Sequence, residues 1–368
     1  MFNKLINTNA GGGTPENFNT VLYTGTANSL PVTDVGFQPD LIWIKNRTSA
    51  IFNPGGTDHH TLIDSVRGTN SQIYANLTNG QNTFTNQISS FDATGFTLGT
   101  GFTDSEPGRL VNVSGTEYVA WCWKAAGSAN TFNVLENDTV VSGSTTSAVG
   151  ISTTGSNMTL TGASVNRDKG FSIVTNTGGS SYPEWISHGL GVVPDLVMTK
   201  QINNSANWIV NIGANVIDSN DYTLNLNTTA DATLQGRQMT STVVPLTYTP
   251  ATQSFISYAF KSIPGFSKIS SYVGNGNVNG PIVNCGFKPA FVMYKCTSTE
   301  PGNWIIIDNK RALTNPRTPH LRANTDGLDD YGPNEDINFL DNGFQPVGVS
   351  NYNSNSIGQT YIYMAFAN

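Results

Sequence analysis

The chain has few charged side chains and no long apolar run. Only 12% of its 368 residues are Asp, Glu, Lys or Arg, and the formal net charge is −7. Binding to nucleic acid needs clustered Lys and Arg, and the sequence has no basic stripe, so nucleic acid is not expected as a partner. No apolar run approaches the length of about 20 residues that spans a membrane, and the N-terminus lacks the apolar core of a signal peptide. We expect a protein made in a cytoplasm, without membrane insertion.

Cysteine is equally scarce. Cys122, Cys285 and Cys296 cannot all pair within one chain, and each lies in or beside an apolar run. Buried, reduced thiols are therefore expected.

The four histidines give little support to a catalytic or metal centre. No Gly-x-Ser-x-Gly elbow accompanies them, which disfavours a Ser-His-Asp hydrolase. His59 and His60 are adjacent, and adjacent side chains point to opposite faces of a strand, so a turn that orients loops is favoured over a metal site. The sequence predicts no enzyme, no cofactor and no metal.

Helical periodicity is also missing: we find no window with apolar residues at i, i+3, i+4 and i+7 between helix caps. In its place are 37 glycines and many Asn, Thr and Ser residues, which suit tight turns and strands. Short strands with turn signals about every ten residues indicate β-sandwiches. The expected fold class is all-β.

A short pattern occurs three times. Residues 39–45, 194–200 and 289–295 each begin with Pro, continue with large or β-branched side chains and end with Lys. Pro sits well at the first position of a strand. In the first copy Leu41 and Trp43 would face one side and Ile42 and Ile44 the other, which predicts a central strand buried on both faces. We call these runs the seed strands and expect them to be equivalent, with Trp43 filling the core of the first module.

Flanking landmarks extend the repeat. Upstream, each copy has a strand-like run from Phe18, Phe171 or Phe266 to a Gly, and the third run is one residue longer, which predicts a β-bulge there. Downstream, each copy ends on an aromatic strand, at 118–124, 255–261 and 361–366. The first and third copies share a Gly-Phe pair that the middle copy lacks.

These landmarks divide the chain into five parts. We expect three β-sandwich modules of jelly-roll or concanavalin-lectin-like topology, together with a flexible N-terminal arm and a β-rich connector rich in Ser, Thr and Gly. The expected boundaries are 1–17 for the arm, 18–127 for module 1, 128–169 for the connector, 170–261 for module 2 and 262–368 for module 3.

Module 3 contains an Asp/Asn-rich segment around residues 324–336. It lacks the spacing of an EF-hand loop, so a solvated acidic loop is favoured over a Ca²⁺ site. Paired carboxylates for glycoside hydrolysis could lie in the same segment, but the sequence does not give their separation. Arg67 and Arg311 each follow an Asp by three residues, Asp64 and Asp308, and are expected to tie a loop structurally.

The motifs resemble a known group of proteins. The segments 36–45, 60–68, 90–99 and 118–124 are similar to a module of tailed-phage virion proteins, common in marine phages and usually described as tail-fibre or structural proteins. The resemblance implies a component of the virion, assembled in the host cytoplasm. The chain departs from long fibres in having no coiled-coil or collagen-like shaft.

Three functions remain open at this stage. The first is a non-enzymatic tail fibre, or a capsid fibre or decoration, that acts in assembly and in recognition of a host-surface glycan. The second is a depolymerase that cleaves host polysaccharide, and the third is a capsid cement protein without a ligand. Expected partners are other virion proteins and further copies of the chain, with a homotrimer favoured.

We expect a ligand surface on the long loops of module 3. Aromatic faces and planar Asp or Asn groups are typical of sugar recognition, although such residues also populate ordinary turns. The candidate ligand-binding residues are Asp326, Asp329, Asp330, Tyr331, Asn334 and Tyr352.

Overall fold

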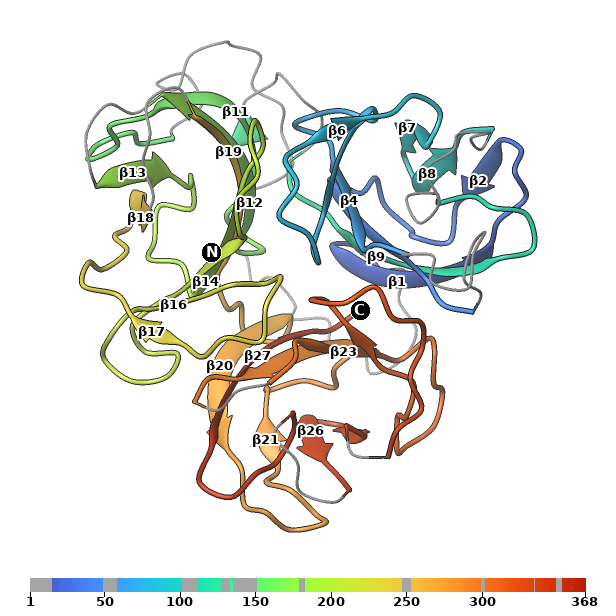
Figure 1. Cartoon of the computed structure of the whole chain (residues 1–368), viewed down its shortest axis with the longest axis vertical. Helices are drawn as coiled ribbons and strands as arrows, with labels where there is room; N and C mark the ends of the chain where they lie inside the picture. The colour runs from blue at the N-terminus through green and yellow to red at the C-terminus, as the bar shows by residue number, and fades with distance from the viewer. Residues whose placement is uncertain are drawn as a thin grey trace, which may run out of the picture.

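The computed structural model describes residues 15–48, 58–100, 111–126, 133–134, 151–178, 183–246, 253–298, 302–333, 335–348 and 353–368. Within these residues there are strands and turns and no α-helix, which confirms the all-β fold class. Most of the predicted N-terminal arm lies outside the described residues. Three lobes, each built from one large and one small sheet, surround a common centre (Figure 1).

Module 1 pairs a six-stranded sheet with a three-stranded one. In spatial order the large sheet contains β1 (Phe18–Thr24), β9 (Glu117–Trp123), β3 (Leu41–Asn46), β4 (Thr61–Asp64), β5 (Ser71–Tyr74) and β6 (Asn82–Thr83). The small sheet contains β2 (Leu30–Val32), β8 (Gly95–Leu98) and β7 (Ile88–Asp92).

In the part of module 2 that the structure describes, an eight-stranded sheet is paired with a two-stranded one. The large sheet contains β10 (Asn133–Val134), β11 (Thr159–Asn166), β12 (Phe171–Gly178), β19 (Gln253–Phe260), β14 (Leu196–Gln201), β15 (Ile209–Ile212), β16 (Tyr222–Leu224) and β17 (Thr233–Leu234). The small sheet contains β13 (Glu184–Ser187) and β18 (Val243–Leu246). Strand β11 falls in the segment expected to be a connector and pairs with β12, so it extends the module 2 sheet.

Module 3 repeats the plan of module 1 with a five-stranded and a three-stranded sheet. The large sheet contains β20 (Ser267–Val273), β27 (Thr360–Phe366), β22 (Phe291–Cys296), β23 (Ile305–Asp308) and β24 (Leu321–Arg322). The small sheet contains β21 (Val283–Asn284), β26 (Gly343–Pro346) and β25 (Ile337–Leu340).

The seed strands β3, β14 and β22 are equivalent, as predicted. Each lies between the last strand of its module and the strand that follows it in the chain. The register agrees as well: Leu41 pairs with Trp123, Leu196 with Phe260, and Phe291 with Phe366. Every residue of the three strands is buried. Register positions in one module can therefore be compared directly with those in the others.

The predicted bulge in the third copy is wrong. Strand β20 pairs with β27 without a register shift, from Ser267 opposite Phe366 to Val273 opposite Thr360. Phe366 occupies the position of Trp123, which pairs with Phe18, so Ser267 and not Phe266 is the counterpart of Phe18. Phe266 lies one residue before the strand, which accounts for the longer spacing in the sequence.

The Gly-Phe pairs begin the equivalent strands β8 and β26 of the small sheets. A Cβ atom on Gly95 would collide with the carbonyl oxygen of Val32, and one on Gly343 with that of Val283. Only glycine allows the two strands to approach so closely. The phenylalanines that follow, Phe96 and Phe344, are fully buried inside their sandwiches.

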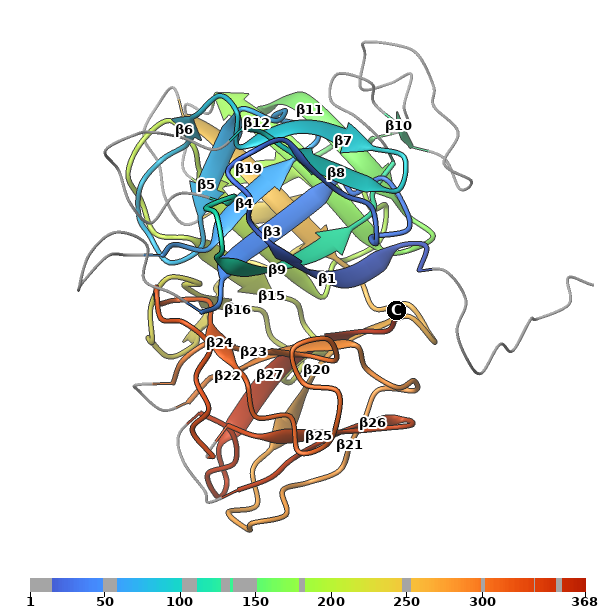
Figure 2. The ribbon, with the colours of Figure 1, turned by 90° about the vertical axis from the view of Figure 1, so that its right-hand side faces the viewer.

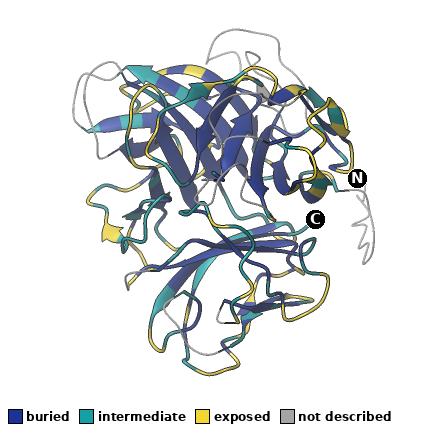
Figure 3. Cartoon of the chain, turned by 45° about the vertical axis from the view of Figure 1, so that its right-hand side comes forward, coloured by how far each residue is buried: buried dark blue, intermediate teal, exposed yellow. Residues whose placement is uncertain are grey.

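The two faces of each large sheet belong to different cores. In module 1, Ile42 and Ile44 pack inside the sandwich, whereas Leu41 and Trp43 join a second cluster that contains residues of all three modules. This corrects the prediction that Trp43 fills the core of its own module. Figure 2 shows the module 3 sheet against those of modules 1 and 2, and in Figure 3 the strands facing the centre are buried.

Hydrogen bonds cross the three module boundaries at equivalent positions. The indole Nε1 of Trp208 in module 2 donates to the carbonyl of Tyr74 in module 1 at 2.8 Å. Trp304 of module 3 does the same to Asn225 of module 2 at 2.9 Å. Backbone amides also cross all three boundaries: Gln81 donates to Ile202, Ala232 to Thr297 and Asp329 to Arg47. Each module therefore contacts the other two through the same parts of its fold, in a cyclic order.

The two predicted Asp-Arg pairs tie their loops and also reach across boundaries. Arg67 Nε contacts Asp64 Oδ2 at 2.6 Å, and Asp64 Oδ2 also accepts from Tyr258 of module 2 at 2.8 Å. Arg311 Nε contacts Asp308 Oδ2 at 2.6 Å, and the same oxygen accepts from Trp121 of module 1 at 3.1 Å.

At the third boundary, between modules 2 and 3, the equivalent residues are apolar. Ile212 stands where Asp64 and Asp308 stand, because it pairs with Leu196 of the seed strand. Met364 takes the place of Tyr258 and Trp121. Both are buried in the shared core. A buried carboxylate needs a charged and a hydrogen-bonding partner. Because the carboxylate and its hydrogen-bonding partner are both replaced by apolar residues, neither leaves an unpaired polar group at this boundary.

The three cysteines are free and buried, as predicted. Burial raises the pKa of the Cys285 thiol to about 12. No helix within the described ranges is long and apolar enough to cross a membrane.

Candidate functional site

The structure separates the candidate residues of module 3 into two groups. Asp326 and Asp329 face module 1, whereas Asp330 and Tyr331 lie toward the outer surface. Asn334 and Tyr352 lie outside the described residues. The Asp-rich segment therefore serves two purposes, and the boundary between them falls between two adjacent aspartates.

Asp329 is a structural residue, which corrects its assignment as a ligand-binding residue. Its side chain is only 2% exposed and contacts Arg47 Nε at 2.9 Å and Arg311 Nη1 at 2.8 Å. Its backbone amide donates to the carbonyl of Arg47. Because both carboxylate oxygens bind guanidinium groups inside a module boundary, Asp329 is not available to a ligand.

Asp326 also belongs to the boundary. It interacts electrostatically with Lys45, a fully buried seed-strand lysine of module 1. Burial lowers the pKa of Lys45 to about 8, although Asp58, Asp326 and Asp329 act against this shift. The corresponding lysines donate to backbone carbonyls of the neighbouring module, Lys200 to Thr78 and Lys295 to Thr229, each at 3.0 Å. Asp326 occupies the place of these two threonines.

Asp330 and the next residue, Tyr331, remain exposed, and Asp330 lies beside polar side chains that were not among the candidate residues. The side chain of Asp330 is 41% exposed and Tyr331 is 63% exposed. Asp330 forms a two-residue bridge with His320 through their backbone groups. We use the term module 3 patch for His320, Arg322, Asp330, Tyr331 and Glu335.

Arg322, at the end of β24, is the centre of the module 3 patch. Its Nη2 lies 2.9 Å from Asp330 Oδ2 and 3.5 Å from Glu335 Oε1. The arginine is partly exposed, while the carboxyl group of Glu335 is nearly buried. Glu335 Oε1 also accepts from Asn353 Nδ2 at 2.7 Å. The patch thus combines one guanidinium with two carboxylates at the surface of the sandwich.

The hydrogen bonds define the tautomer of His320. Arg322 can only donate, so His320 Nε2, 3.2 Å from Arg322 Nη2, accepts. The proton then sits on Nδ1, which lies 3.2 Å from the carbonyl oxygen of Thr318. Burial lowers the pKa of His320. His320 is accordingly neutral and holds Arg322 in place, and it does not form ion pairs with Asp330 or Glu335.

The two aspartates of the segment that border the patch have opposite pKa shifts. The pKa of Asp330 lies below its usual value, since the effect of burial is outweighed by the Gly332 amide and by Arg322. The pKa of Asp336 is raised, first by burial and also by Glu335. Asp336 is nearly buried and accepts from Thr318 Oγ1 at 3.4 Å. Asp330 is therefore a charged acceptor, and Asp336 is more readily protonated.

Sequence reasoning did not select His320 and Arg322, which precede the Asp/Asn-rich segment, or Glu335, which lies within it. Arg322 and Glu335 are thirteen positions apart in the chain and meet only through the fold. The structure alone shows that Thr78 and Thr229, the counterparts of Asp326, lie at module boundaries.

The chain matches one known protein family. Residues 14–162 and residues 145–368 both match the family described as Domain of unknown function (DUF7483). No curated protein and no solved structure matches the chain. Because the two matches together cover nearly the whole sequence, the chain belongs to the DUF7483 family.

Proposed function

We propose that the protein is a non-enzymatic structural component of a phage virion, a tail fibre or a capsid fibre or decoration, that also recognises glycans on a host surface. The repeated motifs that resemble tailed-phage virion modules suggest the setting. The observation that carries the proposal is the core shared by all three modules. It makes one rigid body from three sandwiches and leaves the outer loops free to bind.

Assembly would join this body to other virion proteins. A homotrimer remains our preferred arrangement of copies. Sedimentation velocity of the purified chain at micromolar concentration tests this directly: a trimer is expected, and a clean monomer would rule out a trimer that forms without the particle.

The module 3 patch is the surface that we assign to glycan recognition. Tyr331 offers an exposed aromatic face, and Asp330 and Arg322 offer planar acceptor and donor groups held by Glu335 and His320. Sugars pair their C–H faces with aromatic rings and their adjacent hydroxyls with such groups. Preorganised polar groups lose less freedom on binding, which favours recognition of a weakly binding ligand.

Host adsorption of phage carrying Asp330→Ala with Tyr331→Ala tests this assignment. We expect normal particle assembly and at least tenfold slower adsorption. Asp341→Ala is the matched control, because Asp341 is a module 3 aspartate whose side chain is 97% exposed and which pairs only with the surface residue Lys288 among the described contacts. Unchanged adsorption by the double variant would exclude the module 3 patch as the host-binding surface. It would favour a cement protein without a ligand.

One observation favours a second candidate, a polysaccharide depolymerase. Asp336 and Asp330 have pKa values shifted in opposite directions, and glycosidases combine a protonated with an ionised carboxyl group. Incubation with host polysaccharide, followed by assay of new reducing ends, separates the candidates. If the protein is not an enzyme, the wild type should release no more reducing ends than the Asp336→Asn variant. Reducing ends released by the wild type but not by the variant would favour the depolymerase.

A further inference from the structure

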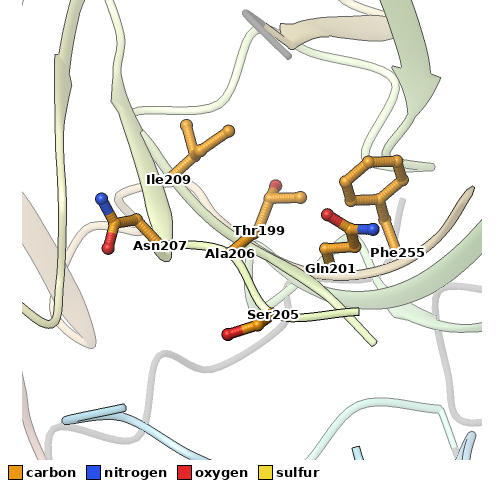
Figure 4. A pocket seen from close by; sticks show the side chains of 7 residues that line it. All are labelled: Thr199, Gln201, Ser205, Ala206, Asn207, Ile209 and Phe255. Carbon is orange, nitrogen blue, oxygen red and sulfur yellow. The ribbon is translucent and has the colours of Figure 1, made fainter. Parts of the chain in front are cut away.

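Module 2 contains a pocket of about 250 Å³ at one end of its sandwich (Figure 4). The walls come from the end of β14, the start of β15, the loop between them and the start of β19. The lining residues are Thr199, Gln201, Ser205, Ala206, Asn207, Ile209 and Phe255. Figure 4 shows Thr199, Gln201, Ile209 and Phe255 projecting to the same side of the sheet. This is the inner face of the sandwich, because Phe255 shares a core cluster with Ile186 of β13 and Val244 of β18.

The small sheet covers less of this face in module 2 than elsewhere. Modules 1 and 3 each have three strands in the small sheet, whereas β13 and β18 are the two found in the described part of module 2. Strand β18 corresponds to β8 and β26, because Val244 pairs with Ile186 as Phe96 pairs with Val32. A valine thus replaces a buried phenylalanine, and the counterpart of β7 and β25 is not among the described strands.

Side chains on the large sheet also become smaller and more polar. Tyr23 stacks on Tyr118 in module 1, with ring centres 5.0 Å apart, and Tyr272 stacks on Tyr361 in module 3 at 4.9 Å. The registers place Asn176 and Phe255 at these two positions in module 2. One aromatic partner is lost, so one face of the Phe255 ring lacks the stacking seen in the sister modules.

Two further positions follow the same trend. Thr199 occupies the place of Ile44 in module 1 and of Tyr294 in module 3. Asn211 occupies the place of Ile63 and Ile307, as their pairing with the seed strands shows. Substituting small or polar residues at apolar core positions costs stability unless something else fills the space. A pocket of this kind in one of three related modules therefore suggests a binding role.

The chemistry of the pocket suits a neutral, hydroxyl-rich ligand. None of its lining side chains is charged. The polar groups among the lining residues are hydroxyl and amide groups, from Thr199, Gln201, Ser205 and Asn207, and these can pair with ligand hydroxyls as donors or acceptors. Asn207 is held in orientation by Asn227, whose Nδ2 donates to Asn207 Oδ1 at 2.9 Å.

We propose that this pocket binds a single neutral sugar ring. Phe255 and Ile209 would contact the C–H face of the ring, while Gln201 and Asn207 would hydrogen-bond its hydroxyls. The volume lies below the range of about 300–1,000 Å³ of pockets for drug-sized ligands, which limits the ligand to about one hexose. This site is distinct from the module 3 patch in place and in charge, and does not depend on the function proposed for that patch.

Saturation-transfer NMR of the full chain with glucose, galactose and N-acetylglucosamine tests the site. We expect signal transfer to at least one sugar, with a dissociation constant on the order of 1 mM because so small a ligand makes few contacts. Thr199→Tyr, which installs the residue that module 3 carries, should fill the pocket and weaken binding at least tenfold. Thr233→Tyr is the matched control, since Thr233 is exposed on β17 of the same module.

Phe255→Ala provides a second test if Thr199→Tyr does not fold. It removes the aromatic ring that would contact the sugar and places no larger side chain in the pocket. Arg322→Ala in the module 3 patch should leave binding of these sugars unchanged, and a loss there would move the site to module 3. The proposal is wrong if no sugar in the panel receives signal from the wild-type chain. It is equally wrong if the folded pocket variants bind as strongly as the wild type.

Discussion

At the scale of single residues, neighbours in the sequence have unrelated roles. Asp329 joins Arg47 and Arg311 inside a module boundary, and Asp330, the next residue, contacts Arg322 at the surface. The sequence shows an acidic run at this place and predicts that it is solvated. It cannot show which carboxylate meets an arginine that lies 282 positions away, as Arg47 does from Asp329.

Replacing these two aspartates separately tests their roles. Asp329→Ala leaves two buried guanidinium groups without their shared carboxylate, which should lower the free energy of unfolding by about 3–5 kcal/mol. Asp330→Ala removes a partly exposed ion pair and should cost no more than about 1 kcal/mol. Chemical denaturation of both variants provides the comparison, and equal losses would refute the division of the segment.

Because of His188, we expect the stability of the folded chain to depend on pH. It is fully buried in module 2, and burial lowers its pKa to about 4. Between pH 6.5 and 4 the unfolded chain binds a proton at this site that the folded chain does not, so stability falls as the pH falls. From pH 7 to pH 5 the loss from this residue should be about 2 kcal/mol.

His188→Gln should remove that part of the acid sensitivity. Denaturation of the wild type and the variant at pH 7 and pH 5 measures it, as the difference between the two losses. If both proteins lose the same stability over this range, His188 binds its proton equally well in the folded and the unfolded chain, and the expected effect of burial is absent.

At the scale of elements, the seed strands are the central strands around which each large sheet is built. Their apolar runs and leading prolines were sufficient to predict three equivalent central strands, because burial on both faces leaves a continuous apolar signature. The partner of each face could not be predicted in this way. An apolar side chain such as Trp43 is equally compatible with a sandwich interior and with a neighbouring module, and only the fold assigns it to the shared core.

Trp43→Ala measures the contribution of a seed strand to that shared core. The side chain is 1% exposed, donates to His60 Nδ1 at 2.9 Å and packs edge-on against Trp121. Truncation should cost about 3–5 kcal/mol, the range for large buried aromatics. Trp185→Ala is the matched control, because Trp185 is only partly buried on β13, and it should cost clearly less. A near-neutral change in the melting of Trp43→Ala would mean that the core does not need this side chain.

At the scale of the whole molecule, three modules act as one body. The same boundary contacts recur in cyclic order, and the shared core contains side chains from every module. Separating one module would expose a large apolar face on each part. Variation among the modules is then informative: module 2 keeps the backbone contacts at its boundaries, has Ile212 in place of the aspartate of the Asp-Arg pairs, and has lost apolar side chains inside its own sandwich.

Differential scanning calorimetry should therefore show one cooperative transition. Modules that share a core lose it together, so the calorimetric and van't Hoff enthalpies should agree, which is the criterion for two-state unfolding. Well-separated transitions, or a van't Hoff enthalpy near one third of the calorimetric value, would show modules that unfold independently.

Reconstruction of the intact phage particle tests the central claim, that this rigid three-lobed body is part of a virion. We expect density on the tail or the capsid into which all three modules fit as a single unit, with the module 3 patch directed away from the particle. Purified infectious particles that contain neither such density nor the chain itself by mass spectrometry would contradict the claim.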